Sequence, residues 1–228
     1  YPLYDKVGNR KQKTDSLGTH TYSYDNLYQL TSAVIANPPQ AGEAIYAYDP
    51  VGNRTTASAA GTPSSYTPNN LNQYSSVDSQ AYSYDLNGNL TSDGTRTYSY
   101  DYENRLITSS PLMGEETGGG VYTYDPFGRR LTKTVDGQST TYLYDGDQIL
   151  ESFPCNLITG SCTLAASFLS GPGIDEPLEL VEHPSGTNYY FHADGLGSIT
   201  HLTNSSGTTQ KSYTYDPYGK LLSAKDPS

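Results

Sequence analysis

The dipeptide Tyr-Asp recurs along most of this chain, and its spacing constrains the fold more than any other sequence feature. With Asn69 taken as one degenerate copy, consecutive copies between Asp5 and Asp145 lie 16, 20 or 24 residues apart, always a multiple of four. A spacing this regular indicates an array of equivalent structural units. The aspartates of the eight intact copies are Asp5, Asp25, Asp49, Asp85, Asp101, Asp125, Asp145 and Asp216.

Each unit has the pattern of a β-hairpin. Most copies begin with Tyr-x-Tyr, as in Tyr22/Tyr24 and Tyr142/Tyr144. Residues i and i+2 of a strand share one face, so each pair places two rings on the same side of a sheet. A unit of about 20 residues holds two strands of about six to eight residues and two turns. We therefore predict an array of antiparallel β-hairpins.

Turn residues follow the strands. The segments 49–52, 125–128 and 216–219 read Asp-Pro-x-Gly, and 5–8 and 85–88 have Asp and Gly without the proline. Asp first, Pro second and Gly fourth is the pattern of a type I turn, and a glycine with positive φ closes it as a bulged hairpin. In the other units a segment ending in Leu or Ile replaces the glycine motif. The predicted structural turn residues are Asp5, Gly8, Asp49, Gly52, Asp85, Gly88, Asp125, Gly128, Asp216 and Gly219.

The composition agrees with an all-β protein that is rich in turns. The chain of 228 residues contains 23 tyrosines, 22 glycines and 14 prolines, and this aromatic content distinguishes it from a disordered chain. The only stretch without turn residues that is long enough to suggest a helix is 162–170, and it is short and flanked by Gly160 and Gly171. We therefore expect helix to be nearly absent. The net charge of −11 disfavours nucleic acid, which is bound mainly by Lys and Arg. No apolar run approaches the ~18 residues of a membrane span, so we expect no membrane insertion.

The two cysteines, Cys155 and Cys162, lie seven residues apart around a plausible Thr-Gly turn. Opposed across a hairpin they would form a disulfide that contributes about 2.5 kcal/mol. A reduced structural pair is the alternative, whereas a zinc site lacks two further ligands nearby. A disulfide favours an oxidising, extracellular setting.

The repeats resemble those of the rearrangement-hotspot (RHS) or tyrosine-aspartate (YD) family. The resemblance is carried by Tyr-Asp-x-x-Gly-Asn-Arg at 48–54 and Tyr-Asp-x-x-Asn-Arg-Leu at 100–106. The segments 171–178 and 189–199 are similar to the start of the family's core segment. The resemblance implies a spiralling β-sheet in a shell or filament. It divides the chain into YD repeats at 1–150, a connecting segment with the cysteine pair at 151–186 and the start of the core-like segment at 187–228, all in one continuous sheet.

The function that this resemblance implies is structural. Family shells enclose a toxin in bacterial members and form an extracellular scaffold in teneurins. The self-cleaving aspartates of the family's downstream core do not occur in this sequence. We therefore expect a non-enzymatic, secreted or cell-surface wall segment without cofactors. Its partners would be further copies, the remainder of a longer chain, or an enclosed toxin.

A cell-surface binding module is the alternative function. Exposed tyrosine faces could stack on sugar rings or contact a receptor, whereas the competing interpretation packs the rings between neighbouring strands with arginine across them. The candidate rings for glycan stacking are Tyr46, Tyr48, Tyr98, Tyr100, Tyr122 and Tyr124.

Two candidate metal sites carry little weight. His192, Asp194 and His201 could approach one another, but ordinary hydrogen bonding explains such residues in a strand and turn. The segment 85–89 resembles the opening of a calcium loop, yet its glycine falls where the turn needs it rather than at the sixth position of an EF-hand. We expect no metal at either place.

The two ends of the array predict its assembly. Terminal hairpins present unpaired strand edges that recruit further strands, unless charged residues such as Arg10, Lys11 and Lys13 guard them. We expect a piece of a longer shell, or a subunit that stacks head to tail, rather than a stable isolated monomer.

Overall fold

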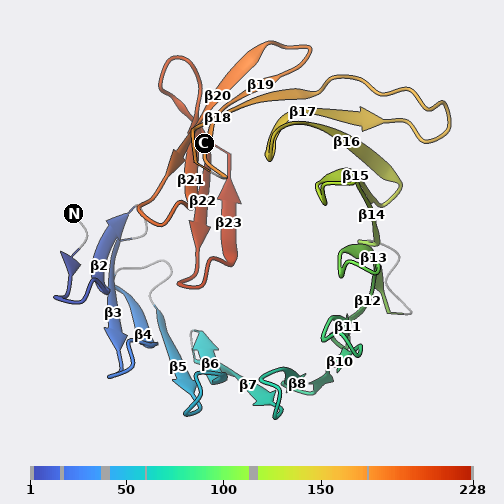
Figure 1. Cartoon of the computed structure of the whole chain (residues 1–228). Coiled ribbons are helices and arrows are strands. Elements are labelled where there is room, and N and C mark those ends of the chain that lie inside the picture. Colours follow the sequence, from blue (N-terminus) through green and yellow to red (C-terminus); the bar gives the residue numbers. More distant parts are fainter. Residues whose placement is uncertain are drawn as a thin grey trace. The chain divides into compact units, whose positions relative to one another are not determined.

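The fold is a long antiparallel meander of β-strands. The computed structural model describes residues 3–15, 18–36, 42–59, 61–112, 118–173 and 175–226. Tyr1, Ile174 and Ser228, which enter the sequence-based expectations, lie outside these ranges. Within them every regular element is a strand, so the predicted all-β class is confirmed and no helical membrane span is present. Within each sheet, every strand pairs with its neighbours in the chain, as Figure 1 shows.

The strands form two sheets, and in both the spatial order is the chain order. The nine strands of the first sheet are β1 (Leu3–Tyr4), β2 (Arg10–Asp15), β3 (Gly18–Tyr24), β4 (Leu30–Ala36), β5 (Gly42–Tyr48), β6 (Arg54–Ala59), β7 (Thr62–Pro68), β8 (Tyr74–Val77) and β9 (Gln80–Ala81). The second sheet has fourteen strands: β10 (Ser83–Tyr84), β11 (Leu90–Ser92), β12 (Arg96–Tyr100), β13 (Leu106–Pro111), β14 (Gly120–Tyr124), β15 (Arg130–Val135), β16 (Gln138–Asp145), β17 (Gln148–Cys155), β18 (Ala166–Ser170), β19 (Pro177–Glu182), β20 (Thr187–Ala193), β21 (Ile199–Thr203), β22 (Thr209–Tyr215) and β23 (Leu221–Lys225).

The chain divides into two compact units, Tyr1–Thr97 and Tyr98–Ser228. The predicted connecting segment 151–186 contains most of β17 and all of β18 and β19. It therefore continues the meander as strands. The expected organisation into 1–150, 151–186 and 187–228 stays a prediction.

The Asp-x-x-Gly turns are bulged hairpin turns, as their pattern predicts. In the first of these turns the amide of Gly8 donates to the carbonyl of Asp5, and the amide of Asp5 donates to the carbonyl of Asn9. The register shifts at the tyrosine before the aspartate, so that Tyr4 lies opposite Arg10. The five predicted glycines have positive φ: Gly8 at 92°, Gly52 at 94°, Gly88 at 86°, Gly128 at 84° and Gly219 at 83°.

Units without this glycine keep the same turn in all but one case. Tyr28, Asn72 and Asn104 occupy the glycine position at φ of 63°, 59° and 61°, a conformation that residues with a Cβ adopt only at some cost. The unit at Asp145 is different, because Asp145 pairs directly with Gln148 across a two-residue turn.

The spacing in multiples of four follows from antiparallel pairing. Hydrogen-bonded and non-hydrogen-bonded residue pairs alternate along two antiparallel strands, so the pairing pattern repeats every two residues. A hairpin that keeps its closing turn in the same pairing position therefore grows by two residues in each strand. The Tyr-Asp end of each unit is constant, and the added residues lengthen the other end.

Burial is uneven between the two faces of the strands. In β5, Ala44, Tyr46 and Tyr48 on one face are buried or half-buried, whereas Glu43 and Ile45 on the other are exposed. The described apolar residues with the least exposure are Tyr22, Ala33 and Tyr46, at 9%, 5% and 7%. Tyrosine therefore supplies much of the packing that aliphatic residues provide in other folds.

Candidate functional site

A hydrogen bond from a tyrosine hydroxyl joins one hairpin to the preceding one. The donor is the tyrosine immediately before the turn aspartate, and the acceptor is a backbone carbonyl at the start of an earlier strand. We call this contact the tyrosine clamp. Clamps in the described part of the chain include Tyr24 to Arg10 at 2.9 Å, Tyr48 to Leu30 at 2.7 Å, Tyr84 to Tyr74 at 3.0 Å, Tyr124 to Leu106 at 2.8 Å, Tyr144 to Arg130 at 2.8 Å and Tyr215 to Ile199 at 2.8 Å.

The acceptor has a constant place in its own unit. It is the fifth residue after the turn Asp or Asn, as Arg10 follows Asp5 and Leu30 follows Asp25. The same residue lies opposite the tyrosine of its own hairpin, as Leu30 lies opposite Tyr24. Each clamp therefore fixes the turn end of one hairpin against the turn end of the next, independently of strand length. The separation between donor and acceptor along the chain varies from 10 to 18 residues, so it is not a fixed sequence spacing.

The turn aspartate organises its own loop. Oδ1 of Asp49 accepts the amides of Val51 at 3.0 Å and Asn53 at 2.8 Å, and Oδ2 accepts Nδ2 of Asn53 at 2.9 Å. The hydrogen bond from the Asn53 side chain is the largest influence on the carboxyl and lowers the pKa of Asp49. Asn89 has the same effect on the pKa of Asp85.

The residue four positions after the turn Asp or Asn varies between units but has a recurrent role. Arg105 Nε donates to Asp101 and Arg129 Nε donates to Asp125, both at 2.7 Å. Asn69 substitutes for aspartate in the degenerate unit, and its Oδ1 accepts the amides of Leu71 and Gln73 at 2.8 and 3.0 Å. The turn therefore needs an oxygen acceptor at its first position rather than a charge.

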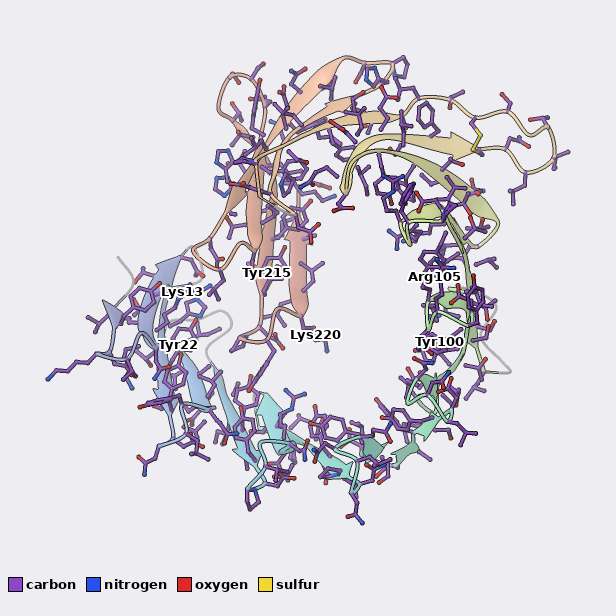
Figure 2. All side chains as sticks on the ribbon, in the orientation of Figure 1. Lys13, Tyr22, Tyr100, Arg105, Tyr215 and Lys220 are labelled. Atoms are coloured by element: carbon purple, nitrogen blue, oxygen red, sulfur yellow. A yellow bond between two sulfur atoms is a disulfide. The ribbon has the colours of Figure 1, made fainter. Side chains whose placement is uncertain are left out.

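Arginine side chains lie over the tyrosine rings. The guanidinium carbon of Arg54 is 4.4 Å from the ring centre of Tyr66 and 6.0 Å from that of Tyr46. Arg130 lies 5.4 Å from Tyr142 in the same manner. Both arginines stand at the fifth position after the turn aspartate, so cation–π contacts accompany the clamps along the sheet. Figure 2 shows tyrosine on both units, with Tyr22 on β3 and Tyr100 at the end of β12.

The candidate glycan-stacking tyrosines are occupied by contacts within the chain. Tyr46 is 7% exposed, and Tyr48 and Tyr124 use their hydroxyls in clamps. The Tyr122 hydroxyl lies 3.5 Å from Ser109 Oγ. Tyr98 and Tyr100 are half-buried and also have partners. The structure therefore gives these rings a packing role, and glycan stacking stays a prediction.

Cys155 and Cys162 form a disulfide at the end of β17, seen as the yellow bond in Figure 2. The loop between them is closed by the amide of Asn156, which donates to the carbonyl of Ser161 at 2.8 Å. Gly160 adopts a φ of 69° there. Of the two alternatives for the cysteine pair, the structure has the disulfide.

The two candidate metal sites have other uses. His192 and His201 are cross-strand neighbours whose rings stack 4.3 Å apart. Oδ1 of Asp194 accepts the amides of Leu196 and Ser198, so Asp194 is a turn aspartate of the usual kind. Oδ1 of Asp85 likewise accepts the amide of Asn89. The described part of the chain contains no group of three or more residues suited to hold a metal.

Two further turns of this kind are not among those predicted from the Tyr-Asp repeats. The loops after Asp194 and Asn204 have the same hydrogen bonds, with positive φ at Gly197 and Gly207. Their Asp-x-x-Gly and Asn-x-x-Gly patterns were available as a signal, but the preceding dipeptide is not Tyr-Asp in either case.

Repeated Tyr-Asp turns in an antiparallel meander define this chain as a YD-repeat β-sheet protein. The teneurin YD-shell family profile matches residues 4–228, and the chain belongs to this family.

Relatives and solved structures agree with this assignment. The chain is 37% identical over 181 residues to the tRNA3(Ser)-specific nuclease WapA of Bacillus spizizenii and 36% identical to the tRNA nuclease WapA of Bacillus subtilis. Each alignment covers 76% of this chain, which spans only 7% of either relative. The double-stranded DNA deaminase toxin A of Burkholderia cenocepacia is 24% identical over 251 residues, covering 96% of this chain and 17% of the toxin.

The same fold occurs in a solved crystal structure. In the crystal structure of TcdB2-TccC3-Cdc42, one segment matches the whole of this chain with a TM-score of 0.74 and 19% identity, and the match covers 14% of that chain. The fold and family predicted from the Tyr-Asp repeats are therefore confirmed.

Proposed function

We propose that this chain is a non-enzymatic wall segment of a secreted or cell-surface YD-repeat shell that encloses a toxin cargo. The observation that carries the proposal is the tyrosine clamp. It uses the most distinctive side chains of the sequence to join successive hairpins, which is a structural task. Carboxylates of the kind that could act in catalysis accept amide hydrogen bonds in the turns, as Asp49 does.

The relatives support a cargo with enzymatic activity elsewhere in the protein. Two are named tRNA nucleases and one a DNA deaminase toxin, whereas this chain aligns with a small part of each. A net charge of −11 makes a wall segment a poor binder of nucleic acid. The nuclease or deaminase chemistry of such proteins would therefore belong to a domain other than this segment.

Two measurements test the proposal. The purified 228-residue chain, incubated with total tRNA and with double-stranded DNA, should neither cleave nor deaminate them above the buffer background. Saturable turnover of either substrate would contradict the non-enzymatic role.

The enclosing role is tested in the full gene product. Substituting Tyr48→Phe and Tyr124→Phe together removes two clamps without changing the rings, and the enclosed cargo should then be digested faster by added protease. Tyr28→Phe and Tyr102→Phe change two exposed turn tyrosines and form the matched control. Equal digestion of the cargo in both variants and in the unmodified protein would contradict a wall role for this segment.

A further inference from the structure

Two histidine rings stack across neighbouring strands of the second sheet. His192 on β20 and His201 on β21 are partners in the antiparallel register. Their ring centres lie 4.3 Å apart, and the ring planes are 4° from parallel. Both residues are half-buried. We call these two residues the histidine pair, and they are half of the four histidines in the chain.

Threonine hydroxyls hold the two rings in place. Nε2 of His192 lies 2.9 Å from Oγ1 of Thr203, and Nδ1 of His201 lies 3.1 Å from Oγ1 of Thr200. The Thr200 hydroxyl donates its one proton to the carbonyl of His192 at 3.1 Å, so it accepts a hydrogen bond from Nδ1 of His201. The neutral His201 ring therefore carries its proton on Nδ1, and a further proton would add at Nε2.

The carboxylates on the neighbouring elements have other partners. Glu179 on β19 lies opposite Tyr190, and its Oε1 accepts the side-chain amide of Asn188. Asp194 lies in the turn between β20 and β21, where its Oδ1 accepts two backbone amides. Positive charge on the histidine pair would therefore lack the ion-pair partner that a buried or half-buried charge needs.

The other side of the histidine pair leads to a cation. Ser212 on β22 lies opposite His201, and Lys225 on β23 lies opposite Ser212, so the same cross-strand row ends in a lysine. The surroundings of His20 are different, because its Nε2 lies 2.9 Å from Oδ1 of Asp15. A proton on His20 is accommodated by that carboxylate, whereas protons on the histidine pair would meet only each other and a lysine along the row.

Acid therefore charges two rings that pack well while they are neutral. Two positive rings at this separation repel each other, and the repulsion disfavours the doubly protonated folded state. Burial, and then the charge of His192, lower the pKa of His201, whereas the unfolded value is about 6.5. Because the unfolded chain binds more protons below that value, stability is complete above it and is lost as the pH falls toward the lower folded pKa.

The histidine pair lies at a pairing on which the end of the sheet depends. The spatial order of the last strands is β19, β20, β21, β22 and β23, as labelled in Figure 1. Among the described strands, β21–β23 therefore join the rest of this sheet through the pairing of β20 with β21. That pairing consists of four residue pairs, and the histidine pair is one of them. Weakening it loosens three strands together.

We propose that the histidine pair is an acid-sensitive latch between β20 and β21. With both rings neutral the two strands are held together, and with both rings protonated the strands β21–β23 separate from the sheet. Histidine changes its charge between pH 5 and 8, whereas aspartate ordinarily titrates near pH 3.9. The latch therefore opens in a pH range in which the turn aspartates are still ionised. It is a property of the sheet and does not depend on the enclosing role.

Hydrogen exchange of the unmodified 228-residue chain at pH 7.5 and pH 5.0 tests the latch. After correction for the intrinsic pH dependence of exchange, protection of the hairpin 187–203 should fall roughly tenfold, because opening is favoured up to about tenfold per pH unit for each proton taken up. The hairpin of β14 and β15 contains no histidine and should keep its protection. An equal change in both hairpins, or no change in either, would overturn the latch.

Variants assign the effect to the two rings. His192→Gln and His201→Gln each leave one histidine without its stacked partner, so either should abolish most of the loss of protection at pH 5.0. His183→Gln is the matched control, because His183 contacts Oγ of Ser167 at 3.0 Å instead of a second histidine, and the loss should persist in it. A loss that persists equally in all three variants would contradict the latch.

A proton NMR titration gives a readout that is independent of stability. The titration midpoint of His201 should rise in His192→Gln, because the positive neighbour is removed. An unchanged midpoint in the folded variant would show that the two rings do not repel each other, which would also overturn the latch.

Discussion

The hydroxyl of Tyr48 donates a 2.7 Å hydrogen bond to the backbone carbonyl of Leu30, eighteen residues earlier in the chain. Leu30 lies opposite Tyr24, the equivalent tyrosine of the preceding hairpin. One hydroxyl therefore couples two hairpins at their turn ends. The same relationship recurs in five other pairs along the chain, so that the stability of each hairpin depends on the next.

Removing this hydroxyl should destabilise the fold measurably. In Tyr48→Phe the ring remains, but the Leu30 carbonyl loses its partner, at a cost of about 1 kcal/mol in the free energy of unfolding. Urea denaturation of the 228-residue chain measures this loss. Tyr102→Phe is the control, because Tyr102 is 88% exposed at a turn and should change the unfolding free energy little. An equal effect of the two substitutions would show that the clamp contributes nothing.

Acid should weaken the turns through their aspartates. Hydrogen bonds from Asn53 and Asn89 lower the pKa of Asp49 and of Asp85 in the folded chain, whereas the unfolded value is about 3.9. The ionised carboxylates therefore stabilise the fold fully above the unfolded pKa, and this contribution is lost as the pH falls through the lower folded pKa.

The variant Asp49→Asn tests this pH dependence. Asn69 shows that an amide oxygen can accept the two turn amides, so the variant should fold at pH 7. Its unfolding free energy should fall less between pH 5 and pH 2.5 than that of the unmodified chain. Identical pH profiles from urea denaturation would refute the role assigned to Asp49.

Alanine substitutions at two glycines distinguish the cost of backbone strain from the cost of steric crowding by a neighbouring side chain. Gly52 and Gly128 both have positive φ, at 94° and 84°, and a Cβ at Gly52 would also lie 3.1 Å from the Gln29 side-chain nitrogen, whereas Gly128 has open space. Gly128→Ala should cost about 1 kcal/mol of unfolding free energy from the backbone alone. Gly52→Ala should cost more, and thermal and urea unfolding measure the difference. A smaller loss at Gly52 would contradict close packing between the turns.

The disulfide should stabilise the chain through its short loop. Replacing Cys155 and Cys162 together with serine should lower the unfolding free energy by up to about 2.5 kcal/mol, the chain-entropy value for a loop of this length. Reduction of the unmodified chain with dithiothreitol should have a comparable effect. Urea curves that superpose with and without reductant would show that the loop is stable without the bond.

A glycan array distinguishes packing from recognition by the tyrosines. Because Tyr46 is buried and Tyr48 and Tyr124 are engaged in clamps, the purified chain should show no saturable glycan binding through these rings. Saturable binding that Tyr46→Ala abolishes in a folded chain would favour the binding module over the wall segment. The fold of that variant is checked by its far-UV circular dichroism spectrum.

The sequence by itself determined the repeat, the all-β class and the turns. These features depend on contacts within a few residues: Asp49 bonds to the amides of Val51 and Asn53, and Gly52 supplies the positive φ that closes the same turn. Alternation along a strand likewise placed Tyr46 and Tyr48 on one face. Local chemistry is readable from local pattern, and the family resemblance rests on the same residues.

Only the tertiary structure decided what the tyrosine hydroxyls contact. The clamp between Tyr48 and Leu30 depends on which hairpin is adjacent in the sheet, and a meander establishes that adjacency only after folding. The identity of Leu30 is irrelevant to the bond, because a backbone carbonyl accepts it, so no side-chain pattern marks the acceptor.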